Sequence, residues 1–141
     1  MTRARRGERG QALVEMALML PVLLLLLVGI FDLGRAVALS NELSNAVREG
    51  TRYAIVHGSA SSTPQTQASH PLVDAAVMQH TAGVHPDPTI TVTYLDSGSN
   101  DRGKRVKVEA SFPFTPVTSS FLFGGALRTT LGSASTLVIQ Q

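Results

Sequence analysis

The chain opens with a long run of apolar residues. From position 12 to position 31, only Glu15, Pro21 and Gly29 are not apolar. A helix of that length rises roughly 30 Å, which matches the thickness of one hydrocarbon core. The run therefore predicts a membrane-spanning helix, and Glu15 places a charge near one end of it. A carboxylate there costs less than the roughly 2.5–3.5 kcal/mol assigned to a charge at the bilayer centre.

The pattern changes after the apolar run. Apolar residues now recur at spacings of three and four, with polar residues between them, as on one face of an amphipathic helix. We predict one helix from about Gln11 to Val56, which spans the membrane up to about residues 31–34. Its polar face carries Arg48, Glu49 and Arg52, which are either an ordinary solvated surface or a face that meets another subunit.

The second half of the chain combines a short helix with alternating strands. Pro71 is typical of a first helical turn, and Gly83 of a helix end. Residues 89–95 and 105–112 alternate apolar with polar side chains around a predicted hairpin loop, and residues 129–139 supply a third strand. These elements predict an α+β fold with a long helix, a short second helix and a three-stranded antiparallel sheet.

Charge is unevenly distributed along the chain and predicts its orientation. The formal net charge is +2, but four arginines and one glutamate give the first ten residues +3. An arginine-rich flank is typical of the cytoplasmic side of a span. We predict a cytoplasmic leader at 1–10, the long helix at 11–57 and an exported α+β domain at 58–141. The basic residues are not spread over the predicted folded part, so nucleic acid is not an expected partner.

Three interpretations of the N-terminal segment remain open. It could be a cleaved secretory signal, because Ala36-Val37-Ala38 fits a small-residue cleavage site before Leu39. It could be a plain signal anchor, with Glu15 near the inner edge of the span. It could also begin with a leader that is removed by cleavage, and Glu15 would then be retained in the mature helix because the charge has a function.

The third interpretation draws on a family resemblance. The stretch "RGERGQALVEMALMLP" resembles the processing site of type IV prepilins, and together with "NAVREGTRYA" it resembles the TadE-like pseudopilins of tight-adherence (Flp-type) pilus systems. The resemblance implies a pilin-like fold, cleavage between Gly10 and Gln11, Glu15 as the fifth mature residue, and Pro21 as the helix proline, where the helix would kink.

This resemblance also implies the partners of the chain. A membrane-embedded prepilin peptidase would remove the leader on the cytoplasmic face. Other pilins or pseudopilins, the pilus assembly platform and membrane lipid would surround the mature helix. Glu15 would then pair with the new α-amine of a neighbouring subunit and set the register between the two helices.

Candidate chemistry elsewhere is sparse. The chain has no cysteine and no motif of a hydrolase, a phosphate-binding loop or a dinucleotide fold, so we expect neither catalysis nor a cofactor. Its four histidines lack metal-ligand spacing. The acidic loop of residues 96–101 is better explained as a hairpin turn than as a calcium site. The basic run of residues 101–107 is either a solvated strand edge or a contact to an anionic surface polymer.

Two functions are consistent with this pattern. The first is a minor pseudopilin that acts in tight-adherence pilus assembly, secretion and adhesion. The alternative is a membrane-anchored exported binding module that is not processed.

Overall fold

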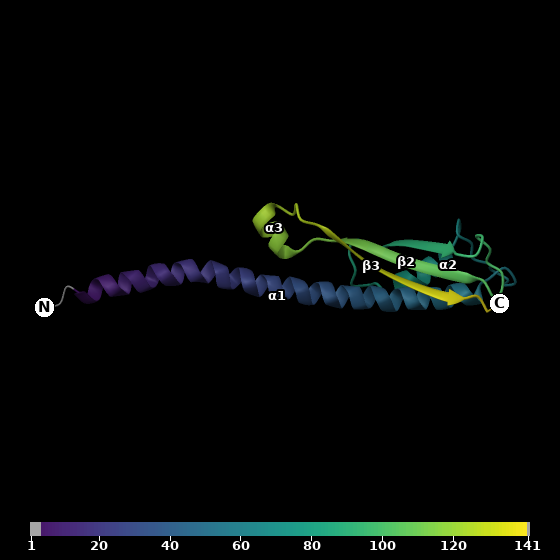
Figure 1. The fold of residues 1–141 in the computed structure, drawn as a ribbon, viewed down its shortest axis with the longest axis horizontal. Helices are drawn as coiled ribbons and strands as arrows, with labels where there is room; N and C mark the ends of the chain where they lie inside the picture. The colour runs from purple at the N-terminus through teal and green to yellow at the C-terminus, as the bar shows by residue number, and fades with distance from the viewer. Residues whose placement is uncertain (1–3, 141) are drawn as a thin grey trace. The chain divides into compact units, whose positions relative to one another are not determined.

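The structure is a computed structural model that describes residues 4–140, with side chains from residue 10 onward (Figure 1). Its elements are α1 (Ala4–Val56), α2 (Pro71–Gln79), β1 (Thr89–Tyr94), β2 (Arg105–Phe114), α3 (Val117–Phe123) and β3 (Thr129–Val138). The predicted α+β class is confirmed, with its long helix, short second helix and three strands. Three features differ from the prediction. Helix α1 begins at Ala4 and not at Gln11, and α2 ends at Gln79, before Gly83. Helix α3 lies between the second and third strands, where no helix was predicted.

The chain forms two compact units, and α1 contributes to both. One unit joins the chain up to Arg35 with Thr115–Leu127, and the other joins Ala36–Phe114 with the residues from Arg128 onward. The second unit contains the sheet, α2 and the C-terminal half of α1. The first contains the apolar half of α1 together with α3.

The sheet is antiparallel and has the order β1-β2-β3. In its register Val92 lies opposite Val108, and Val108 lies opposite Ser135. Side chains alternate between the two faces of a strand, so every second residue of β2 faces the core. The buried residues of β2 are Val106, Val108, Ala110, Phe112 and Phe114.

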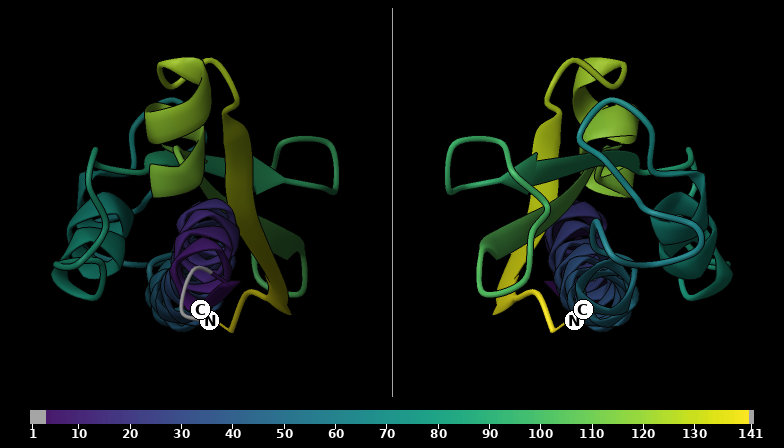
Figure 2. Two further views of the ribbon diagram at one scale, coloured as in Figure 1. Left: turned by 90° about the vertical axis from the view of Figure 1, so that its left-hand side faces the viewer. Right: turned by 90° about the vertical axis from the view of Figure 1, so that its right-hand side faces the viewer.

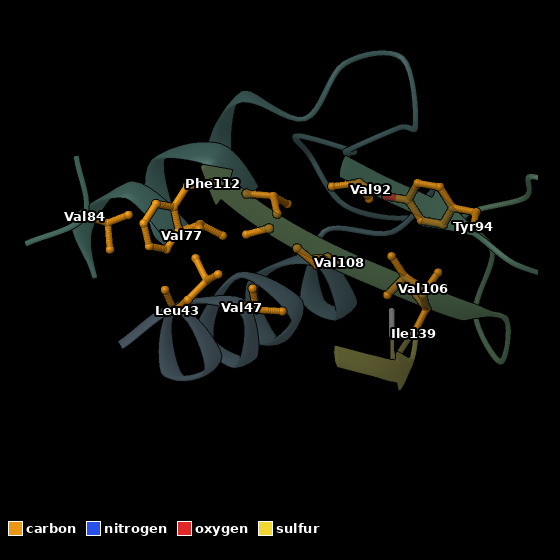
Figure 3. Packing of buried hydrophobic residues seen from close by; sticks show 14 of the residues in the cluster. Leu43, Val47, Val77, Val84, Val92, Tyr94, Val106, Val108, Phe112 and Ile139 are labelled. Carbon is orange, nitrogen blue, oxygen red and sulfur yellow. The ribbon is translucent and has the colours of Figure 1, made fainter. Parts of the chain in front are cut away.

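The core of this unit lies between the sheet, α2 and the second half of α1. Helix α1 contributes Leu43 and Val47, and α2 contributes Val73 and Val77, all fully buried (Figure 3). The end-on views of Figure 2 show α2 beside this part of α1, with the strands on another side of it. Each such side chain contributes about 1.5–3 kcal/mol when it is fully buried. The amphipathic pattern of residues 36–56 therefore reflects packing against the sheet and α2.

Helices α1 and α2 approach each other closely at a glycine. Gly50 is buried, and a methyl group added to it would overlap Val77 Cγ2 and touch Val73 and Val108. Only a residue without a side chain allows this packing.

The loop between α1 and α2 is organised by one buried residue. The backbone carbonyl of Gln65 accepts hydrogen bonds from Tyr94 Oη at 2.6 Å and from Asn100 Nδ2 at 3.1 Å. Its side-chain Oε1 accepts one from the backbone N–H of Leu72 at 3.1 Å, next to the start of α2. The loop is thereby tied to β1 and to the β1–β2 hairpin.

An ion pair closes the β1–β2 hairpin. Asp96 accepts hydrogen bonds from Arg105 through the backbone N–H at 2.8 Å, Nη2 at 2.9 Å and Nε at 3.3 Å. These bonds, with the charge of the guanidinium, lower the pKa of Asp96 from 3.8 to about 2.

We predict that Gly50→Ala lowers the free energy of unfolding by about 1–3 kcal/mol, because overpacking outweighs the gain in helix propensity. Gly34→Ala is the matched control, since an added methyl group there meets nothing within 4 Å. Denaturant unfolding of the full chain in detergent micelles measures both variants. Equal behaviour of the two would contradict the close packing at Gly50.

The Asp96–Arg105 pair predicts a dependence of stability on pH. Because folding lowers the pKa of Asp96, its stabilising contribution is complete above the ordinary pKa of 3.8 and is lost as the pH falls through about 2. Asp96→Asn should therefore have a lower melting temperature than the wild type at pH 7. The difference in melting temperature should disappear as the pH falls from about 4 to 2. Thermal unfolding across this range tests it, and a gap independent of pH would refute it.

Candidate functional site

The predicted processing residues lie on the exposed first part of α1. Gly10 and Gln11 are both exposed, and a methyl group on Gly10 would meet nothing within 4 Å. No other described segment of the chain covers the peptide bond between Gly10 and Gln11. The helix would have to open locally before a peptidase could cleave this bond. The cleavage itself stays a prediction.

Glu15 is exposed on an apolar surface of the same helix. Its neighbours on that face are Ala12, Met16, Met19, Leu20 and Leu23. Among the residues that the structure describes, Glu15 has neither a hydrogen bond nor an ion pair. The fold therefore leaves this carboxylate available to a group outside the chain.

The apolar half of α1 has the properties of a membrane anchor. Its large apolar side chains between positions 13 and 27 are each 42–71% exposed. The most apolar window of this helix has a mean hydropathy of 2.6, and none of it is buried. A water-exposed apolar surface of this extent is very costly, so lipid is the surrounding that fits it. The helix continues through Pro21 without interruption, and a kink there stays a prediction.

The alternative signal-peptide site lies inside α1. Ala36, Val37 and Ala38 are helical, and both Ala36 and Leu39 pack against the hydrophobic core. Cleavage before Leu39 would cut the helix next to residues that contribute to that core.

The polar face near the end of α1 is exposed and locally paired. Arg52 Nη1 lies 3.5 Å from Glu49 Oε2, and Arg48 Nη1 donates to Asn45 Oδ1 at 3.5 Å. The structure thus brings Glu49 and Arg52 together, while Arg48 pairs elsewhere. Exposed pairs of this kind contribute little to stability, so this face remains open to a partner.

Side-chain hydrogen bonds form a clasp between α1 and α3 that was not predicted from the sequence. Asp32, only 6% exposed, accepts hydrogen bonds from the backbone N–H of Val117 at 2.8 Å and of Thr118 at 2.8 Å. The Thr118 hydroxyl donates a third, at 2.7 Å. Two of the N–H groups that a helix leaves unsatisfied in its first turn are therefore satisfied by a residue 85 positions away. Arg35 Nη2 adds a bond to the carbonyl of Thr115 at 3.3 Å.

The segment that follows α3 folds back on it. Ser119 Oγ donates to the carbonyl of Leu127 at 2.8 Å and accepts from its N–H at 3.0 Å. Gly124 ends the helix in the left-handed conformation, with φ 58°. Pro116 before the helix and Gly124 after it are the sequence signal that could have revealed α3. The contact with Asp32 had no such signal.

The charged side chains of the hairpin mostly pair with neighbouring groups. Of its basic run, Arg105 pairs with Asp96 at 2.9 Å and Lys107 with Glu109 at 2.8 Å. Asp101 accepts hydrogen bonds from Ser59 Oγ at 2.7 Å and Ser99 Oγ at 2.6 Å, which lower its pKa. In the described part of the chain, no three His, Asp or Glu side chains gather as metal ligands. The basic run is thus partly neutralised by its own neighbours.

Comparison with known protein families gives a match. Residues 10–52 match the model of the family described as TadE-like protein, which confirms the resemblance over about a third of the chain. The matched region begins at Gly10 and includes Glu15, Pro21, Asp32 and the Arg48–Arg52 face. No curated protein and no solved structure matches the chain.

We predict that Asp32→Ala accelerates amide hydrogen exchange of Val117 and Thr118 by about fivefold, since a lost helix cap costs on the order of 1 kcal/mol. Strand amides of the other unit, such as those of Val92 and Val108, should be unaffected. Asp87→Ala is the control, because Asp87 is exposed and makes no hydrogen bond with the described residues. Unchanged exchange at residues 117 and 118 would show that the clasp does not hold α3.

Proposed function

Because residues 10–52 are TadE-like, we propose that this chain is a minor pseudopilin that acts in the assembly of a tight-adherence pilus. One observation carries the proposal: Glu15 is a charged residue on the exposed apolar surface of the span, and the described chain gives it no partner. An anchor needs no such charge, whereas an assembling helix can use it.

The proposed role of Glu15 follows from electrostatics. A carboxylate in an apolar surrounding is costly unless a cation pairs with it, and at low dielectric that pairing is strong. Cleavage after Gly10 creates a new α-amine at Gln11. The amine of one subunit pairs with Glu15 of its neighbour, so side-by-side helices are favoured in the register that satisfies both charges.

The proposed processing follows from the orientation. The leader carries Arg3, Arg5, Arg6 and Arg9, and such a flank stays on the cytoplasmic side. A prepilin peptidase then removes the leader on that face, and the α+β unit lies outside. In this role the chain carries out no catalysis and needs no cofactor. Its partners are the peptidase, other pilins or pseudopilins and the assembly platform, and Arg48, Glu49 and Arg52 offer a second contact face.

We predict that Glu15→Ala reduces pilus assembly on the order of tenfold or more, because loss of one partner from a buried charge pair is strongly destabilising. Membrane insertion should be retained, since the substitution removes a charge from the span. Val14→Ala, a neighbouring exposed position in the same span, is the control. Membrane fractionation and counts of pili on cells measure the two effects. Pili that tolerate Glu15→Ala as well as Val14→Ala would favour the alternative, an anchored binding module.

A further inference from the structure

Helix α3 and the turn after it carry an unusual concentration of exposed apolar side chains. Phe121 is 85% exposed, and four further residues are between 42% and 58% exposed: Val117, Leu122, Phe123 and Leu127. These residues make up the α3 patch. A soluble surface rarely gathers so many large apolar groups without something that covers them.

The α3 patch is free of charge. No Asp, Glu, Lys or Arg occurs between Pro113 and Leu127, and the first charged residue after it is Arg128. A patch that receives a charged or strongly polar partner would carry complementary groups. The composition fits contact with hydrocarbon and not with such a partner.

Asp32 fixes the depth of the α3 patch along α1. Asp32 is the first charged residue after the apolar run, so it marks the end of the hydrocarbon-spanning part of the helix. Its three hydrogen bonds hold Val117 and Thr118 at that level, and α3 begins there. Figure 1 shows α3 beside α1 in this region.

Exposed apolar side chains of α1 lie at the same level of the helix as Asp32. Ile30, Phe31 and Leu33 of α1 flank Asp32 and are 60–66% exposed. They belong to the same compact unit as α3. The apolar surface of α1 therefore reaches the level along the helix at which Asp32 holds the start of α3.

We propose that the α3 patch inserts into the membrane interface at the Asp32 end of the span, as a second lipid contact of the chain. Helices that present an apolar face to a membrane lie in the plane of the interface, with that face about 5–10 Å into the boundary between headgroups and acyl chains. The Asp32 clasp then does two things: it satisfies the first N–H groups of α3 where water is scarce, and it holds the patch at the level of the interface. The proposal requires α1 to span the membrane but does not depend on processing or on pilus assembly.

The chain contains no tryptophan, so one introduced tryptophan is a unique probe. Phe121→Trp replaces one exposed aromatic residue with another and preserves the fold. The full chain is reconstituted in phosphatidylcholine vesicles whose acyl chains are brominated near the headgroup, which quenches fluorescence at interfacial depth. Leu23→Trp, in the middle of the span, reports whether α1 has inserted. Val56→Trp, on α1 and 24 residues beyond Asp32, reports a site in water.

We expect the brominated lipid to quench Phe121→Trp at least twofold more than Val56→Trp, and its emission to be shifted to shorter wavelength. Both effects should persist when the protein is diluted in lipid. Quenching no greater than that of Val56→Trp, with Leu23→Trp still quenched or shifted, would overturn the proposal while leaving the anchor intact. A blue shift that disappears on dilution would mean that a second copy of the chain covers the patch, and this too would overturn it.

Discussion

One helix must hide its apolar residues in two different surroundings, and the rest of the structure depends on this constraint. From Ala36 to Val56, α1 buries its apolar face against the sheet and α2, with Leu43 and Val47 fully buried. From Ala12 to Leu27 every residue of the helix is exposed, and its apolar residues recur on all sides. The first pattern builds a folded unit, and the second requires lipid or neighbouring helices. The change from one pattern to the other occurs around Asp32.

Two carboxylates, one near each end of the apolar segment, differ in burial and in hydrogen bonding. Asp32 is almost fully buried and accepts three hydrogen bonds from α3 within its own chain. Glu15 is exposed and has no partner among the described residues. A buried polar group is normally satisfied, so Asp32 has a structural role that the fold completes. Glu15 is the carboxylate that remains for another molecule, as the pseudopilin hypothesis requires.

Elements with strong local periodicity could be predicted from the sequence. The apolar run, the amphipathic continuation to Val56 and the three alternating strands each follow from side chains a few residues apart. What could not be predicted depends on distant contacts: the Asp32 clasp joins residues 85 positions apart, and Gln65 organises a loop through Tyr94 and Leu72. Helix α3 was not predicted because it is only seven residues long and lies in a stretch rich in proline, phenylalanine and glycine. The early start of α1 at Ala4 reflects a leader with no proline to stop a helix. The site residues Gly10, Gln11 and Glu15 came from the family resemblance, because no local periodicity reveals a cleavage site.

The most direct measurement is the N-terminus of the mature protein, by intact mass and terminal sequencing of the membrane fraction, with and without the prepilin peptidase. The account predicts a chain that starts at Gln11 when the peptidase is present and retains its leader when it is absent. That result would place a new amine four residues before Glu15. A chain that keeps its leader in the presence of the peptidase would contradict the pseudopilin account and leave an anchor. A chain that starts at Leu39 would contradict the anchor as well.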